Sequence, residues 1–303
     1  MTLDELMRRY GAPGRIVFRL GHCGYPEVVL ANKYGVAVVS LLGANVLSYR
    51  PTGHAEVLFR PARRDYARGD SFHGGVPVCF PQFGKLTIPG MRQHGFARLM
   101  PFEVSASSYS DEMTEITLRL RSDDATRSVW PHDFELLYHI TVSMKLNLRL
   151  VVKNTGKEPF AFTDGLHPYF LIRDRETAVV RGLDGLKCVR SQDGSTRVQE
   201  GNYAIISSSD AFALSAAPRH EFVVFDAALN RALALVASGI TTAVVWNPGV
   251  EQPLDDLAEN EWRRFVCVEP VSAWPKSERD LAPGETHELM AAIQATVNEP
   301  NPT

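Results

Sequence analysis

The chain of 303 residues is dominated by a two-residue repeat of hydrophobic and polar positions. Residues 115–122 are the clearest case, because every second residue from Ile116 to Leu120 is aliphatic and the residues between them are polar. Such alternation is typical of strands with one buried face. Similar short runs, separated by Gly, Asn and Pro, occupy residues 15–20, 27–32, 35–42, 44–50, 56–59, 134–144 and 148–156.

Helical patterns are scarce along the chain. Residues 3–11 predict one short helix near the start, and strands do not alternate with helices as they do in βαβ units. Residues 145–147 predict a hairpin turn, and residues 232–250 predict two strands joined by a turn. No linker rich in Pro and Gly divides the chain. Residues 1–303 are therefore predicted to form a single all-β domain, a large antiparallel β-sandwich.

Residues 73–104 break this rhythm, because they contain four prolines and five glycines among many hydrophobic residues. Proline removes backbone donors that a central strand needs. The segment is therefore predicted to be rich in loops and still to pack against the core. Loops held on a rigid scaffold often carry functional residues.

Charge and cysteine usage narrow the class of protein. A net charge of −3 gives no reason to expect nucleic acid as a partner. The longest uncharged run, residues 232–250, contains Gly, Asn and Pro and is not predicted to span a membrane. The N-terminus does not resemble a signal peptide. Four widely spaced cysteines without a CxxC pair favour neither a disulfide framework nor a zinc site. We expect a cytoplasmic protein, a monomer or weak dimer.

Two titratable residues lie in strand-like runs. His167 stands in DGLHPYFLIR, where Pro168 favours an extended conformation and so fixes which face the imidazole takes. It is either a proton donor facing a cleft or a half-buried histidine bonded to a backbone carbonyl. Glu269 ends the hydrophobic run RFVCVEP. It is either desolvated with a raised pKa, as a general base requires, or paired with Arg263 or Arg264.

Three further candidates lie close together in the loop-rich segment. His94 stands in QHGFAR, next to Gln93 and four residues before Arg98. Each has an ordinary alternative role, because a loop histidine can cap a turn and Arg and Gln are mostly exposed. Phe83 and Trp246 are possible cleft walls, with core packing as the alternative.

Eight motifs, in this order, resemble the aldose 1-epimerase superfamily, and within it the glucose-6-phosphate 1-epimerase branch. They are GGVPVCFPQFG (74–84), QHGFAR (93–98), WPHDFELLY (130–138), NTG (154–156), DGLHPYF (164–170), VVWNP (244–248), VCVEP (266–270) and LAPGE (281–285). The resemblance covers residues 15–295. It implies a galactose-mutarotase-like β-supersandwich and an enzyme that interconverts the α and β anomers of a hexose 6-phosphate.

The resemblance also implies roles for individual residues. It makes His167 the general acid and Glu269 the general base of ring opening, a reaction that needs no cofactor, metal or covalent intermediate. Gln93, Arg98 and Asp210 match substrate-binding positions, and His94 matches a second active-site histidine. The expected partner is a small sugar or sugar phosphate. The expected catalytic residues are thus His167 and Glu269. The expected substrate-binding residues are His73, Gln93, His94, Arg98 and Asp210.

His73 is a departure from the phosphate-specific branch, which usually carries arginine immediately before the GG of GGVP. Arginine offers phosphate a permanent, fork-shaped charge, whereas histidine is only partly charged near neutral pH. If His73 contacts phosphate, binding is expected to weaken with rising pH, and a KM that does not change with pH would remove His73 from that role. Otherwise another basic residue reads the phosphate and His73 only packs.

Three functions therefore remain open. The first is a hexose-6-phosphate 1-epimerase, acting on glucose 6-phosphate. The second is a mutarotase for an unphosphorylated or different aldose, which the departure at His73 favours. The third is a noncatalytic sugar-binding sandwich, which has no need of both an acid and a base. A glycoside hydrolase would need two carboxylates flanking one bond, and nothing in the sequence places Asp164 at that separation from Glu269.

Overall fold

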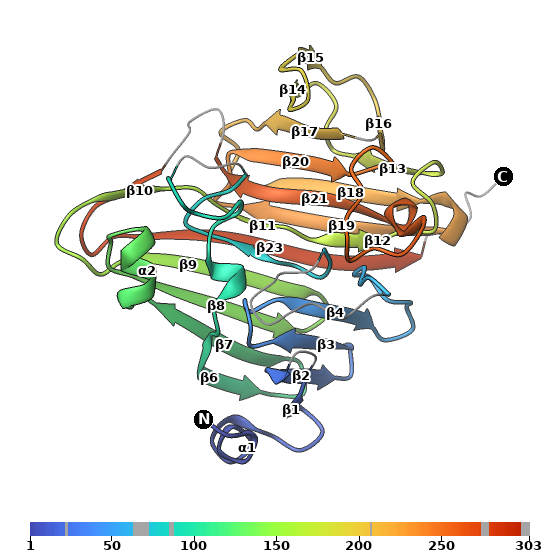
Figure 1. The fold of residues 1–303 in the computed structure, drawn as a ribbon. Coiled ribbons are helices and arrows are strands. Elements are labelled where there is room, and N and C mark those ends of the chain that lie inside the picture. Colours follow the sequence, from blue (N-terminus) through green and yellow to red (C-terminus); the bar gives the residue numbers. More distant parts are fainter. Residues whose placement is uncertain (22–23, 63–72, 85–87, 207, 274–278, 298–303) are drawn as a thin grey trace.

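The computed structural model of the chain describes residues 1–21, 24–62, 73–84, 88–206, 208–273 and 279–297. Its strands pair antiparallel throughout these residues, which confirms the all-β prediction (Figure 1). In Figure 1 the eight-stranded sheet lies in the upper part of the view, the nine-stranded sheet extends from there to the lower left, and the smaller N-terminal sheet lies at the lower right. Among the described residues, no helix is long and apolar enough to cross a membrane.

The larger sheet has nine strands and forms the back of the core. In spatial order they are β16 (Tyr203–Ala204), β13 (Ala178–Arg181), β18 (His220–Asp226), β19 (Arg231–Ser238), β23 (Thr286–Val297), β9 (Leu146–Asn154), β8 (Phe134–Val142), β7 (Thr114–Arg121) and β6 (Glu103–Tyr109). Burial alternates strictly along β8, where Leu136, Tyr138 and Ile140 are buried and the residues between them are partly exposed. The two-residue repeat of hydrophobic and polar positions in the sequence thus corresponds to side chains that point alternately into the core and toward the outer face.

The second large sheet carries the functional site. Its strands are β15 (Thr196–Val198), β14 (Lys187–Arg190), β17 (Ser208–Ala213), β20 (Thr242–Asn247), β21 (Phe265–Ser272), β11 (Asp164–Leu166) and β5 (Val78–Cys79), and β12 (Tyr169–Leu171) also pairs with β21. A central strand such as β21 is buried along its whole length. A residue there that points away from the core must therefore face another enclosed space.

Smaller elements complete the fold. Strands β1 (Ile16–Leu20), β2 (Pro26–Asn32), β3 (Gly35–Ser40) and β4 (Val46–Pro51) form a four-stranded sheet, and β10 (Phe160–Phe162) pairs with β22 (Arg279–Leu281). The helices are α1 (Leu3–Tyr10), α2 (Asp124–Val129) and the 3₁₀ turns η2 (Ala97–Leu99), η3 (Ala227–Leu229) and η4 (Glu261–Arg264). Helix α1 confirms the predicted N-terminal helix and begins with a capping box between Thr2 and Glu5.

Several sequence predictions differ in detail from the structure. The hairpin turn lies at residues 143–145, because Leu146 and Asn147 already belong to β9. The two strands predicted within residues 232–250 exist, but β19 and β20 join different sheets, so the turn between them connects the layers. Helix α2 was not predicted from the sequence. It is only six residues long and is stabilised by reciprocal capping between Asp123 and Thr126.

The loop-rich prediction for residues 73–104 is confirmed for the residues that the structure describes. Its only strand at the site is the two-residue β5, yet Val76, Val78 and Phe80 are fully buried. Gly95 shows why this loop needs glycine: its φ is 73°, and an added Cβ would lie 2.1 Å from the carbonyl oxygen of Phe80.

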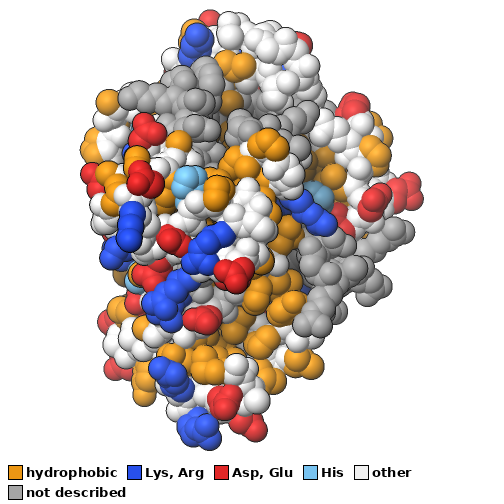
Figure 2. All heavy atoms as spheres, turned by 60° about the vertical axis from the view of Figure 1, so that its left-hand side comes forward, with side chains coloured by type: hydrophobic (Ala, Val, Ile, Leu, Met, Phe, Trp, Pro, Cys, Tyr) orange, Lys and Arg blue, Asp and Glu red, His pale blue; other side chains and the backbone are white. Residues whose placement is uncertain are grey.

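The molecular surface mixes both signs of charge. On the face shown in Figure 2, acidic and basic side chains lie interspersed, with hydrophobic side chains between them. The described cysteines Cys79, Cys188 and Cys267 are free thiols buried in the interior, whereas Cys23 lies outside the described residues.

Candidate active site

A cavity of about 540 Å³ lies against one face of the eight-stranded sheet. This volume is within the range of about 300–1,000 Å³ that is usual for small-molecule sites. Its walls combine aromatic rings with polar side chains from segments far apart in the sequence. The lining residues are His73, Pro77, Cys79, Phe83, Gly84, Gln93, His94, Arg98, His167, Tyr169, Ser191, Ser209, Ala211, Val244, Trp246, Gln252, Leu254 and Glu269.

Strand register brings Glu269 to the cavity. Glu269 lies opposite Val244 in the β20–β21 ladder, and Trp246 lies opposite Cys267. Residues directly opposite each other in a ladder share a face of the sheet. Val244, Trp246 and Glu269 all line the cavity. The side chain of Glu269 is 2% exposed, so its carboxyl group is enclosed by protein.

His167 reaches the cavity from a break between two strands. It lies between β11 and β12 and is followed by Pro168, which has no N–H to continue a ladder. Its main-chain N–H donates to the carbonyl of Pro77 (3.0 Å), so the GGVP motif holds this break in place. The imidazole stacks on the ring of Tyr169, with centroids 4.8 Å apart and planes 13° apart. This packing orients the ring.

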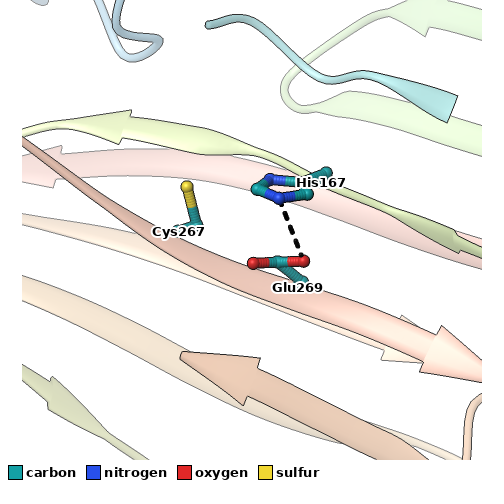
Figure 3. Close-up of side chains that lie close together, drawn as sticks. All are labelled: His167, Cys267 and Glu269. Atoms are coloured by element: carbon teal, nitrogen blue, oxygen red, sulfur yellow. Dashed lines mark ion pairs between the residues drawn. The ribbon is translucent and has the colours of Figure 1, made fainter. Parts of the chain in front are cut away.

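His167 and Glu269, hereafter the acid–base pair, meet in the cavity (Figure 3). Nε2 of His167 lies 3.3 Å from Oε2 of Glu269. Within the described residues, neither Oε2 of Glu269 nor Nδ1 of His167 has a hydrogen-bond partner. Arg263, one alternative partner of Glu269, instead binds Asp174 and Glu176. The pair therefore has hydrogen-bonding capacity left for a ligand.

Burial determines the charge of the acid–base pair. It lowers the pKa of His167 well below 6.5, with smaller contributions from His94, His73 and Arg98. Burial likewise raises the pKa of Glu269 well above 4.5. Because desolvation disfavours the charged form of each group, the favoured resting state is a neutral imidazole beside a protonated carboxyl. One proton is then shared by two groups.

His94 is held in a strained conformation beside the pair. Its φ is 63°, in the left-handed region that non-glycine residues seldom occupy. Its main-chain N–H donates to the carbonyl of Gly84 (3.1 Å), and the N–H of Gly84 donates to Nδ1 of His94 (3.2 Å). The ring packs edge-on against His167, with centroids 5.3 Å apart. Backbone strain that persists at such a position is typical of functional sites.

The contact with Gly84 fixes the tautomer of His94. Burial, with help from the charges of Arg98 and His73, lowers the pKa of His94 to about 3, so the ring is neutral. Nδ1 accepts a hydrogen bond, and the ring proton is therefore on Nε2. Nε2 lies 3.2 Å from the amide group of Gln93. The atom of Gln93 that faces it is the amide nitrogen, so a proton on Nε2 of His94 is satisfied there only when the amide turns to present its oxygen.

Arg98 and His73 lie farther along the cavity. Arg98, in η2, donates from Nη2 to the carbonyl of Gln93 (2.8 Å) and lines the cavity. At His73, one carboxylate makes two contacts. The main-chain N–H of His73 donates to Oδ2 of Asp256 (2.7 Å), and its Nδ1 lies 2.8 Å from Oδ1. No pattern in the sequence singles out Asp256, because it lies 183 positions from His73 in an unpatterned loop.

The structure does not place Asp210 among the residues that line the cavity. Its neighbours Ser209 and Ala211 line the cavity, and successive side chains of a strand point to opposite faces. Asp210 is fully buried on the other face, where it accepts hydrogen bonds from Arg197 and Tyr203. It therefore holds β15 and β16 to β17, and Ser209 takes its place at the cavity.

Comparison with known proteins identifies the family. The family model for aldose 1-epimerase matches residues 26–294. The chain belongs to the aldose 1-epimerase family. A Salmonella typhimurium protein provisionally named glucose-6-phosphate 1-epimerase is 34% identical over 240 residues, which is 78% of this chain and 80% of that protein. An Escherichia coli protein with the same provisional name is 32% identical over the same shares. This aldose epimerase is thus an isomerase, as the sequence motifs indicated.

Solved structures agree with this assignment. A crystal structure of a Salmonella typhimurium protein provisionally described as a mutarotase superposes with a TM-score of 0.87 at 27% identity, covering 97% of this chain and 99% of that one. A galactose mutarotase related enzyme from Lactobacillus acidophilus has a TM-score of 0.71 at 18% identity, covering 90% and 98% of the two chains, and shares the fold. The galactose-mutarotase-like fold predicted from the sequence is confirmed.

One group of side chains in the epimerase contains metal-binding residue types. His167, Cys267 and Glu269 have donor atoms within 4.8 Å of one another (Figure 3). Donors around one tetrahedral zinc ion lie about 3.3–3.8 Å apart, given bond lengths of about 2.0–2.3 Å. Burial also raises the pKa of the Cys267 thiol well above 9.0, which opposes the thiolate that a metal needs. The group does not fit a resident metal ion as it stands.

Proposed function

We propose that this epimerase interconverts the α and β anomers of glucose 6-phosphate, with the acid–base pair of His167 and Glu269 as its catalytic residues. The observation that carries the proposal is the 3.3 Å contact between a buried imidazole and a buried carboxyl group, each with an unpartnered atom, in a cavity of sugar size. Two positioned groups of this kind are what ring opening and closure require.

The proposed reaction moves one proton at each end of the C1–O5 bond. Glu269 takes the proton of the C1 hydroxyl while His167 gives a proton to the ring oxygen O5, and the C1–O5 bond breaks. C1 becomes an aldehyde and O5 becomes a hydroxyl. After rotation about C1–C2, Glu269 returns its proton to O1 and His167 takes one from O5, so the ring closes on the other face of C1. Protons and electrons balance without any other reactant.

Burial of the acid–base pair supports this cycle. In the ring-closed complex the proton is on His167, and after ring opening it is on Glu269. The neutral pair is therefore the state that accompanies the open-chain sugar. Because burial favours a neutral imidazole and a protonated carboxyl, it stabilises the pair in the open-chain state relative to a solvent-exposed pair.

The other lining residues suit a bound sugar phosphate. The neutral ring of His94 packs next to His167, and Gln93, Ser191 and Ser209 offer hydrogen-bonding groups. The ring of Trp246 lies 5.7 Å from that of His167 and forms an apolar wall. Arg98 supplies a permanent positive charge for the phosphate, with His73 as a second group that can carry a proton.

Exchange NMR between the anomers tests the function. Glucose 6-phosphate, glucose and galactose are held at anomeric equilibrium with catalytic amounts of protein, and the exchange rate above the spontaneous rate is measured for each. We expect acceleration for glucose 6-phosphate, reduced about 10²- to 10⁴-fold in Glu269→Gln and in His167→Gln. No acceleration of any of the three sugars by folded protein would contradict the proposal.

A second candidate is mutarotation of an unphosphorylated aldose. Among the described side chains that line the cavity, Arg98 is the only one with a permanent positive charge, and a carboxylate lies against His73. Both observations favour an uncharged ligand. Acceleration for glucose or galactose, with none for glucose 6-phosphate, would select this candidate.

A further inference from the structure

The histidine at the arginine position of the phosphate-specific branch is clamped by a carboxylate. Both oxygens of Asp256 contact His73, one through the main-chain N–H (2.7 Å) and the other through Nδ1 (2.8 Å). Burial by itself raises the pKa of Asp256, but the hydrogen bonds from His73 outweigh it, so the net pKa lies below 3.8. Asp256 is thus ionised, and Nδ1 of His73 must carry a proton to donate to it.

This clamp determines what the rest of the ring can do. With Nδ1–H directed to Asp256, which does not line the cavity, Nε2 is the nitrogen left for a ligand. The ring is flanked by Tyr169 and Trp246, with centroids 6.4 and 6.2 Å away. Neither ring supplies a charge. The titratable and charged groups around His73 are Asp256, which contacts it, and Arg98, His94 and His167, which line the same cavity.

The two classes of substrate make opposite demands on Nε2. A phosphate dianion offers only acceptors, so it can bond to Nε2 only when that nitrogen is protonated. A sugar hydroxyl can instead donate to the bare lone pair of a neutral ring. An arriving phosphate dianion brings negative charge to the Nε2 side of the ring, opposite the carboxylate of Asp256 at Nδ1.

We propose that Asp256 is a positioning residue which makes His73 a conditional cation, so that binding of a sugar phosphate takes up one proton at Nε2 of His73 while an unphosphorylated sugar binds without proton uptake. This inference rests on the proposed function for its choice of a phosphorylated substrate. A permanent arginine at this position would give the charge without the proton. Phosphate recognition in this chain is therefore coupled to pH.

Titration calorimetry tests the proton uptake without depending on turnover. Binding of glucose 6-phosphate, glucose 6-sulfate and glucose is measured at neutral pH in PIPES and in Tris, whose ionisation enthalpies differ. We expect uptake approaching one proton per molecule for both charged sugars and none for glucose. The sulfate ester does not titrate near neutral pH, so uptake on its binding belongs to the protein.

Variants of Asp256 and His73 test whether the proton taken up on binding is bound by His73. In Asp256→Asn we expect the uptake to fall and KM for glucose 6-phosphate to rise roughly 10- to 100-fold, the size of a lost charge-assisted hydrogen bond, with kcat unchanged. Asp256→Glu keeps the charge and is expected to restore the uptake. In His73→Arg the uptake and the pH dependence of KM disappear together. Asp255→Asn removes a neighbouring exposed carboxylate and serves as the matched control.

The outcomes separate this inference from the proposed function. Accelerated exchange of glucose 6-phosphate without proton uptake would overturn the inference and leave the function in place. Uptake that persists unchanged in both Asp256→Asn and His73→Arg would also overturn it, because another group would then be the site. Proton uptake on binding of glucose 6-phosphate with no acceleration of exchange would support the inference and contradict the function.

Discussion

Replacing Glu269 by leucine is expected to stabilise the protein while abolishing its activity. Leucine fills most of the volume of the glutamate side chain and adds no polar atom to the site. The carboxyl group of Glu269 is 2% exposed, and its Oε2 has no hydrogen-bond partner in the described structure. A buried polar group left unsatisfied costs about 1–3 kcal/mol. Removing it should raise the free energy of unfolding by about that amount, as is common where a site is built for function.

The magnitude translates into a measurable change of Tm. The entropy of unfolding is about 2.1 cal/mol/K per residue, which gives about 0.6 kcal/mol/K for 303 residues. A gain of about 1–3 kcal/mol therefore predicts a rise in Tm of roughly 2–5 °C. Scanning calorimetry at neutral pH measures it, and anomer exchange on the same sample should be reduced at least about 10²-fold.

A second buried glutamate provides the matched control. Glu261 is 7% exposed, but its carboxylate accepts hydrogen bonds from the N–H groups of Ala62 (2.9 Å) and Ala258 (2.8 Å). Glu261→Leu should therefore lower the free energy of unfolding by about 1–3 kcal/mol. If Glu269→Leu also lowered Tm, Glu269 would have a stabilising partner in the folded protein, and the reasoning on the acid–base pair would be refuted.

Three further predictions concern the pH profile, the faces to which neighbouring residues of β17 point, and the loop glycines. Burial lowers the pKa of the imidazole and raises that of the carboxyl in the acid–base pair, so the singly protonated pair should persist across neutral pH. Exchange rates corrected for the spontaneous reaction should therefore fall on the acid side only well below pH 6.5. A midpoint at the ordinary histidine value would contradict this. Ser209→Ala should raise KM with little change in Tm. Asp210→Ala should lower the free energy of unfolding by about 3–5 kcal/mol, because it removes one partner of a buried ion pair. A lower Tm for the serine variant would contradict the conclusion that Ser209 faces the cavity and Asp210 the interior. Gly95→Ala places a Cβ against the Phe80 carbonyl and should lower the free energy of unfolding, measured in urea, by about 2–5 kcal/mol. Gly90→Ala is the control, because its φ is also positive but no atom lies within 4 Å, and it should lower that free energy by about 1–2 kcal/mol. Equal losses would show that the contact with Phe80 does not determine the cost.

The sequence predicted the class of fold because local patterns are sufficient for it. Alternation along residues 115–122 became β7, and the uncharged run 232–250 became β19 and β20. It could not predict that β19 and β20 join different sheets, because that depends on partners far away in the chain. Helix α2 was missed for a local reason: six residues carry too short a period to stand out, and only the cap at Asp123 marks its start.

The site shows the same division between local and distant information. The motifs led to His167 and Glu269, and the structure places these two side chains in contact. They also led to Asp210, whereas the neighbouring Ser209 is the residue that lines the cavity. The surrounding sequence does not determine which face of the sheet a side chain takes, and a shift of one position moves it to the opposite face. Asp256 could not be found, because its meaning lies in contacts with His73, 183 positions away.

The arrangement of charge in the cavity links the two proposals. At the reacting end, burial removes charge, so that a proton can pass between His167 and Glu269 without leaving either group as an isolated ion in a low-dielectric site. At His73 the ring is one-third exposed, and an ionised carboxylate lies beside it. A proton can therefore be recruited there when a phosphate arrives, and its charge acts on His167 in the direction that keeps the imidazole neutral. Neutral chemistry at one end and conditional charge at the other are compatible only because His73 and the pair differ in burial. A variant that buried His73 would be expected to lose phosphate binding before it lost catalysis of an unphosphorylated sugar.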